Sequence, residues 1–192
     1  MTAVWQRAGG QSAPGLVKHA HGLRAARRIF CAFAERDYTA DMPQLLAEQF
    51  IPADPARVWA YFATPQNLDA LTPPDLKFKI LGPPPAPMYA GQLIAYRISP
   101  LPGIWMRWLT EIRHVQTGTY FVDEQRLGPY RLWYHEHHFV ATAGGVQMTD
   151  RVTYEVGWGP FGWLAEKLWV RRQLERIFAY RREQVAAVFP GA

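Results

Sequence analysis

The segment from Tyr120 to Phe139 constrains the fold more than any other part of the chain. It reads as two β-strands joined by a turn at 127–130, because Gly-Pro is a turn signal and both flanks are rich in aromatic and β-branched residues. Side chains alternate between the two faces of a strand, so the residues that share a face follow from their spacing. One face of the predicted hairpin carries Phe121, Asp123, Gln125 and Leu127 from the first strand and Trp133, His135, His137 and Phe139 from the second. Such a mixed face is typical of a lined cavity or of paired polar groups, because a closed apolar core excludes unpaired charges.

The other elements follow from periodicity and turn residues. A strand is expected over 45–51. Asp54 and Pro55 then favour a helix start, since Asp accepts N-terminal backbone N–H groups and Pro suits the first helical position. A second short helix is expected over 67–71, and strands over 77–81, 92–98, 104–115, 120–127, 131–141 and 146–156 form an antiparallel meander. The last strand has an inward set of Val146, Met148, Asp150, Val152 and Tyr154 and a solvent-facing set of Gln147, Thr149, Arg151, Thr153 and Glu155.

A long helix is expected over 161–189, where apolar residues recur near a period of 3.6. The predicted apolar stripe consists of Leu164, Leu168, Leu174, Ile177, Phe178, Arg181 and Val185. The rest of the helix is basic, and we interpret this charge as a solvated face formed by Arg171, Arg172, Arg176, Arg181 and Arg182.

Residues 1–43 differ from the rest of the chain, because five basic residues precede the first acid, Glu35. We predict a flexible basic extension followed by one domain over 44–192; a transit peptide is the alternative for an Arg-rich, acid-poor N-terminus. The single cysteine, Cys31, fits a reducing compartment, so we expect a cytoplasmic protein. No apolar run reaches the length of a membrane span.

The order of a strand, two short helices, six strands and a long C-terminal helix resembles the helix-grip fold of the SRPBCC superfamily. The resemblance covers Gln44 to Phe189, and the segments that carry it are 50–59, 67–74, 121–125, 128–139 and 148–154. These segments resemble the uncharacterised ligand-binding or polyketide cyclase/dehydrase-like branch; START domains and pollen-allergen-like proteins belong to the same superfamily. The resemblance implies an α+β fold in which a curved antiparallel sheet of about seven strands wraps around the C-terminal helix. It also implies an elongated apolar cavity between sheet and helix.

The candidate site residues are those that the predicted faces turn towards this cavity. Two histidines at i and i+2 on one strand face can ligate a metal, with Asp123 or Asp150 as third ligand. We favour instead a structural role in which His135 or His137 pairs with Asp150 or Asp123, because a buried carboxylate needs a partner. The same His–Asp pair, with His135 and Asp150 as the candidate catalytic residues, is a possible general acid/base dyad. We predict no metal and no cofactor, and a ligand-binding set of Trp108, Phe121, Asp123, Gln125, Trp133, His135, His137, Asp150 and Tyr154.

Three functions remain open at this point. The first is binding or carriage of a small hydrophobic molecule that is lipid-like, polyketide-like or aromatic, and it is the one we favour. The second is a cyclase or dehydratase that uses the His/Asp pair in the same cavity. The third is docking on RNA, the ribosome or a membrane surface through the basic helix, although no signature of specific nucleic-acid binding accompanies the charge.

Overall fold

The computed structural model of the protein describes residues 42–83, 87–101, 103–157 and 159–191. The predicted extension 1–43 lies outside these residues except for Met42 and Pro43, as do residues 84–86 of the proline-rich loop. Seven strands are present in the described chain: β1 (Gln44–Ile51), β2 (Lys79–Ile80), β3 (Leu93–Leu101), β4 (Ile104–Gln116), β5 (Tyr120–Leu127), β6 (Tyr130–Thr142) and β7 (Gly145–Val156).

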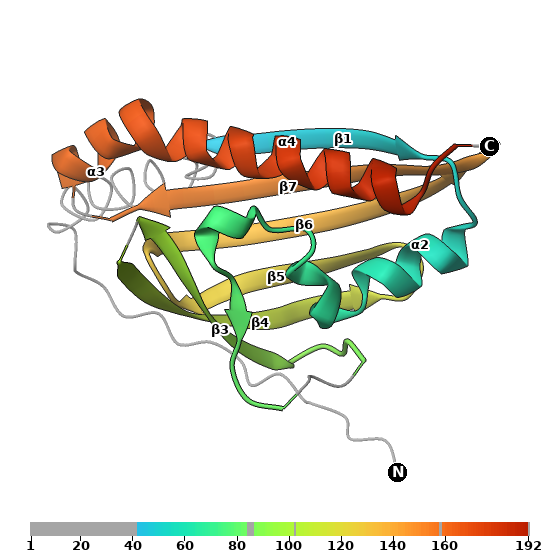
Figure 1. The fold of residues 1–192 in the computed structure, drawn as a ribbon, viewed down its shortest axis with the longest axis horizontal. Coiled ribbons are helices and arrows are strands. Elements are labelled where there is room, and N and C mark those ends of the chain that lie inside the picture. The colour runs from blue at the N-terminus through green and yellow to red at the C-terminus, as the bar shows by residue number, and fades with distance from the viewer. Residues whose placement is uncertain (1–41, 84–86, 102, 158, 192) are drawn as a thin grey trace, which may run out of the picture. The chain divides into compact units, whose positions relative to one another are not determined.

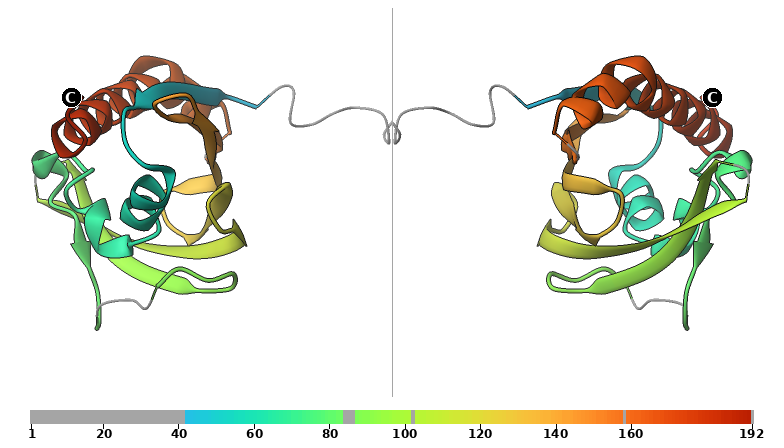
Figure 2. Two further views of the ribbon diagram at one scale, coloured as in Figure 1. Left: turned by 90° about the vertical axis from the view of Figure 1, so that its right-hand side faces the viewer. Right: turned by 90° about the vertical axis from the view of Figure 1, so that its left-hand side faces the viewer.

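These strands form one antiparallel sheet in the order β1-β7-β6-β5-β4-β3-β2. The predicted meander is therefore confirmed, and the first strand closes against the last. Figure 2 shows the sheet curving from β1 round to β3, with the first helix, α2 (Pro55–Phe62), on its concave side. The fold class predicted from the sequence, a helix-grip α+β fold with a curved seven-stranded sheet, is confirmed.

Local signals explain the start of α2. The Asp54 carboxylate accepts hydrogen bonds from the backbone N–H groups of Ala56 and Arg57, at 2.9 and 3.1 Å, and Pro55 occupies the first helical position. The second short helix, expected over 67–71, is a 3₁₀-helix, η1 (Pro65–Leu68), which begins two residues earlier at a proline. A second 3₁₀-helix, η2 (Pro74–Leu76), ends at Lys77 in a left-handed conformation, and this shortens the strand predicted over 77–81 to the two residues of β2.

The C-terminal helical segment is continuous but not regular. It consists of α3 (Gly159–Ala165), a π-helical turn η3 (Glu166–Val170) and α4 (Arg171–Val188), and α4 packs on β1 (Figure 1). The predicted stripe is wrong for Leu164 and Leu168, which are exposed, because the wide π-turn changes the helical phase before α4 begins. From Leu174 onwards the stripe holds, with Leu174, Phe178 and Val185 buried.

The predicted basic face is correct for four of its five arginines. Arg171, Arg172, Arg176 and Arg182 are exposed, whereas Arg181 is buried. Two of the exposed guanidinium groups form ion pairs, Arg171 with Glu175 and Arg176 with Asp75. Docking through this face stays a prediction.

A row of polar side chains divides the apolar interior into two clusters. On β6 the row lies between Trp133 and Phe139, and on α4 it lies between Phe178 and Val185. One cluster packs near α2 and the end of the chain, and the other packs near β3, β4 and the start of α4. The row itself, which we call the polar cluster, consists of Asp123, His135, His137, Asp150 and Arg181.

Among the described residues, no helix combines the length and the apolar character needed to cross a membrane.

Candidate ligand-binding site

A cavity of about 190 Å³ lies on the concave side of the sheet, bordered by α2, η1, strands β3 to β6 and α4. Its lining is mostly apolar. The aromatic and aliphatic side chains include Phe62, Leu71, Leu76, Phe78, Met88, Ile94, Tyr96, Ile98, Trp108, Ile112, Phe121, Trp133, Leu174, Ile177 and Phe178. The polar part of the wall includes Thr64, Asn67, Thr72 and Thr110, together with Asp123, His135, His137 and Arg181 of the polar cluster.

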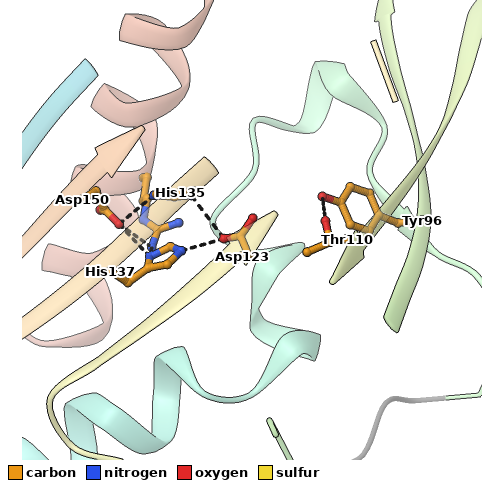
Figure 3. A network of polar contacts seen from close by, with 7 residues as sticks. Tyr96, Thr110, Asp123, His135, His137 and Asp150 are labelled. Carbon is orange, nitrogen blue, oxygen red and sulfur yellow. Dashed lines mark hydrogen bonds and ion pairs between the residues drawn. The ribbon is translucent and has the colours of Figure 1, made fainter. Parts of the chain in front are cut away.

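Strand register brings the polar cluster together. Asp123 on β5 stands directly opposite His135 on β6, and His137 on β6 stands directly opposite Asp150 on β7. Asp123 Oδ2 lies 2.9 Å from His137 Nε2 and 3.4 Å from His135 Nδ1. Asp150 Oδ1 lies 2.7 Å from His137 Nδ1 and 3.1 Å from His135 Nε2. The two imidazoles are therefore held between two carboxylates, as Figure 3 shows.

The environment sets different protonation states for the two histidines. Burial and the neighbouring His137 lower the pKa of His135, and its contacts with Asp123 and Asp150 only partly oppose this. Burial also acts against a charge on His137, but hydrogen bonds to Asp123 and Asp150 outweigh it and raise the pKa of His137. His137 therefore holds a proton more readily than His135, and we assign the proton for which the two rings compete to His137 and a neutral ring to His135.

Both carboxylates are ionised despite their burial. Burial raises the pKa of Asp150, but the Arg181 charge and the hydrogen bonds from His135 and His137 hold it well below its ordinary value. For Asp123, burial is likewise outweighed by the two histidines and Arg181, so its pKa is lowered. Two carboxylates, the guanidinium and the His137 imidazolium sum to zero, which satisfies the rule that buried charges are paired.

Arg181 reaches the cluster from α4. Its Nη2 atom lies 3.4 Å from Asp150 Oδ1 and 3.3 Å from His137 Nδ1. In the assigned protonation state His137 Nδ1 carries a proton that points to Asp150 Oδ1, 2.7 Å away, so this nitrogen cannot accept a hydrogen bond from Arg181. We therefore treat the contact between Arg181 Nη2 and Asp150 Oδ1 as the hydrogen bond. The Nε atom of Arg181 is buried and has no hydrogen-bond partner within the part of the chain that the structure describes.

A second polar pair lies on the same sheet, on the two strands that follow β5 beyond Asp123. The Tyr96 hydroxyl and Thr110 Oγ1 are 3.0 Å apart on the neighbouring strands β3 and β4 (Figure 3). The nearby Trp108 indole N–H is buried and, among the described residues, has no acceptor. Cavity-lining polar groups of this kind can orient a ligand that is otherwise held by apolar contacts.

The structure places six of the nine predicted site residues at the cavity. Those that line it are Trp108, Phe121, Asp123, Trp133, His135 and His137. Their contact with a ligand stays a prediction. Gln125, Asp150 and Tyr154 are not among the described lining residues.

Each of these three side chains is occupied elsewhere. Gln125 exchanges two hydrogen bonds with the backbone of Tyr130, accepting at 3.3 Å and donating at 2.6 Å, and so closes the β5–β6 turn. Asp150 lies behind the histidines. The Tyr154 hydroxyl donates to the buried Glu166 carboxylate in the π-turn at 3.0 Å.

Sequence reasoning missed Arg181 as a member of the site. The signal was present, because Arg181 falls on the apolar stripe of α4 between Phe178 and Val185. A basic residue on a buried stripe calls for a buried acidic partner, and Asp150 was already placed on the inward face of β7. Tyr96 and Thr110 were also missed, because alternation along β3 and β4 gave no polar pattern distinct from the core.

Comparison with known proteins shows the fold alone. No protein-family model and no curated protein sequence matches the chain. Among solved structures, TTHA0849 from Thermus thermophilus is 23% identical with a TM-score of 0.53, over 76% of this chain and 99% of that one. CV1439 from Chromobacterium violaceum is 13% identical with a TM-score of 0.60, over 78% and 98%. The major latex-like protein 151 from Panax ginseng is 14% identical with a TM-score of 0.54, over 78% and 98%. Together with the sheet order and the C-terminal helix, these likenesses show that residues 44–189 have the helix-grip fold.

Proposed function

We propose that the protein binds a small, mainly apolar molecule in the cavity between the sheet and α4. The observation that carries this proposal is the cavity itself, at about 190 Å³ with a largely aromatic and aliphatic lining. A well-packed core has few voids larger than a water molecule. An apolar cavity of about 150 Å³ is known to hold a benzene ring, so the space suits a compound of one or two rings.

The lining gives the ligand a preferred orientation. Trp108, Phe121 and Trp133 would contact the apolar body, while Asp123 and His135 would meet a polar substituent that lies at the polar cluster. Apolar burial contributes about 25 cal/mol per Å², from which the entropic cost of association is subtracted. The affinity thus depends on how well the ligand's shape fits the cavity and on the contact of its polar substituent with Asp123 and His135. A lipid-like, polyketide-like or aromatic compound fits this description.

Native mass spectrometry of the purified protein, followed by denaturing extraction, is the first test. We expect an apolar adduct at near-unit stoichiometry. A neutral dye of two rings, 1-naphthylamine, then measures occupancy in solution through its fluorescence. The expected result is saturable binding of one dye molecule per folded chain, in competition with the extracted compound.

A matched pair of substitutions locates the binding site. Ile94 lines the cavity, and Ile94→Phe reduces its volume; Ile104 is 52% exposed and outside the described lining, so Ile104→Phe is the same exchange as a control. We expect the first variant to bind the dye at least tenfold more weakly and the second to bind it as the wild type does. Equal binding by both variants, or no dye binding by the folded wild type, contradicts the proposal.

A second candidate function is acid/base catalysis on a molecule in the same cavity. It is favoured by one observation: His135 lines the cavity while Asp150 holds its far nitrogen from behind, at 3.1 Å. A neutral imidazole with a lowered pKa, oriented by a carboxylate, is suited to accept a proton. A cyclase or dehydratase of this type loses activity on the extracted compound in His135→Gln while still binding it, whereas a carrier shows no turnover in either form.

A further inference from the structure

We propose that Asp123, His135 and His137 bind a divalent transition-metal ion at the wall of the cavity. Each of the three residues offers one ligand atom, and these atoms all lie within 4.8 Å of one another. The site goes beyond the proposed function, because metal uptake can be measured without any apolar ligand.

The distances between the candidate ligand atoms fit a metal. Asp123 Oδ2 lies 2.9 Å from His137 Nε2 and 3.4 Å from His135 Nδ1. An ion at about 2.0–2.2 Å from nitrogen and oxygen ligands sets neighbouring ligand atoms about 3.0–3.4 Å apart. The two pairs of ligand atoms that involve Asp123 thus already have the spacing that a bound ion requires.

The surrounding groups support the same assignment. A metal-binding histidine usually donates its other ring N–H to a carboxylate, which fixes the tautomer and the ring orientation. Here the far nitrogens of both rings, His135 Nε2 and His137 Nδ1, contact a single carboxylate oxygen of Asp150, at 3.1 and 2.7 Å. Arg181 in turn contacts that oxygen at 3.4 Å, which holds the carboxylate in place from α4.

Charge and access are also consistent with a cation. A bound ion displaces the proton of His137, and the two carboxylates with the Arg181 guanidinium then sum to one negative charge, which attracts the cation. All three ligand residues line the cavity and Asp150 does not. The ion would therefore be open to the cavity on one side, where an oxygen atom of a ligand or of water completes its coordination.

The ligand set selects the kind of metal. Two imidazoles and one carboxylate suit Zn²⁺, Fe²⁺ or another first-row transition ion, whereas Mg²⁺ and Ca²⁺ prefer sites built from oxygen alone. We therefore expect Zn²⁺ and Co²⁺ to bind and Mg²⁺ in large excess not to displace them.

The test is metal binding by the full untagged chain after chelator treatment. Titration with Zn²⁺ in a calorimeter should give one ion per chain, and Co²⁺ should give visible absorption bands of a site with nitrogen and oxygen ligands. Asp123→Ala and His137→Gln should abolish the cobalt bands. Asp150→Asn, which alters only the outer contacts, should weaken binding about 10- to 100-fold.

The control uses the other histidines of the sequence, His19, His21, His114 and His138. Their fourfold replacement by Gln should leave stoichiometry and affinity unchanged. Circular dichroism shows whether each variant is folded, and Asp123→Asn, which keeps the side-chain shape, replaces Asp123→Ala if that variant unfolds. The proposal is overturned if the folded wild type takes up no ion from excess Zn²⁺, or if the fourfold variant loses the site while folded Asp123 variants keep it. Dye binding without metal binding would contradict the metal site and would still support the proposed function.

Discussion

His137 and Asp150 face each other across β6 and β7, with Nδ1 and Oδ1 2.7 Å apart. Arg181 contacts the same carboxylate oxygen from α4. Asp150→Asn keeps the shape of this side chain but leaves the positive charges of His137 and Arg181 buried beside a neutral amide. We expect it to lower the free energy of unfolding by about 3–5 kcal/mol, measured by urea denaturation. Asp69→Asn, the same exchange at an exposed position, should change it by less than about 0.5 kcal/mol. If Asp150→Asn lowered the free energy of unfolding as little as Asp69→Asn does, the Asp150 carboxylate would not be paired with buried positive charges.

Stability should fall in acid because of the two carboxylates. The pKa values of Asp123 and Asp150 are lowered in the folded state. Their contribution is therefore full above the unfolded value, about pH 4, and is lost as the pH falls through the folded values. Urea denaturation at a series of pH values should show this acid loss for the wild type. In Asp150→Asn the acid limb should be flatter, and an equally steep limb would contradict the assignment.

The two histidines should titrate in a fixed order. The pKa of His137 is raised and that of His135 is lowered. In NMR titrations of the metal-free protein, the His137 ring should gain its proton above about pH 6.5 and the His135 ring below it. His137 thus stabilises the fold most below pH 6.5, and this contribution disappears as the pH rises through its folded pKa. The reverse order would assign the shared proton to His135.

A hydrogen bond joins the π-turn to the sheet. The Tyr154 hydroxyl donates to Glu166 at 3.0 Å, and both residues are buried. Tyr154→Phe removes the donor, so we expect a loss of about 1–3 kcal/mol in thermal or urea unfolding. Tyr89 is 56% exposed, and Tyr89→Phe serves as the control with no measurable loss. If the two variants were equally stable, the bond would not contribute to holding the turn.

Local signals predicted most of the fold. Period-two alternation and a Gly-Pro turn gave β5 its bounds, and Asp54 with Pro55 gave the start of α2, because these features depend only on neighbouring residues. The π-turn was not predictable in this way. The π-turn adds a residue to one helical turn, and its position is linked to a contact between Glu166 and Tyr154 on β7. Because this contact joins two separate elements, the spacing of residues within the helix does not predict that Leu168 is exposed.

The candidate site was likewise predicted only in part, because local patterns do not show which elements contact one another. Parity placed Asp123, His135 and His137 on one face correctly, but it could not tell which inward side chains reach the cavity. Asp150 shares the inward face yet lies behind the imidazoles, and Gln125 bonds the turn backbone. Such partners depend on strand register, on β-bulges and on the depth of each side chain, none of which spacing alone encodes.

The polar cluster between the two apolar clusters also restricts the register of β6 against β7 and the position of α4. A slip of two residues between β6 and β7 would keep every side chain on its own face, so hydrophobic alternation alone does not exclude it. That slip would set Asp150 opposite either His135 or Phe139, and only the native register sets it opposite His137. Moving α4 by one turn would likewise bring Phe178 or Val185 to the place of Arg181 and leave the carboxylate without its guanidinium. An alignment that sets Asp150 opposite Phe139, or that takes Arg181 away from it, would bury an unmatched charge, so these five residues disfavour pairings that apolar burial would otherwise accept.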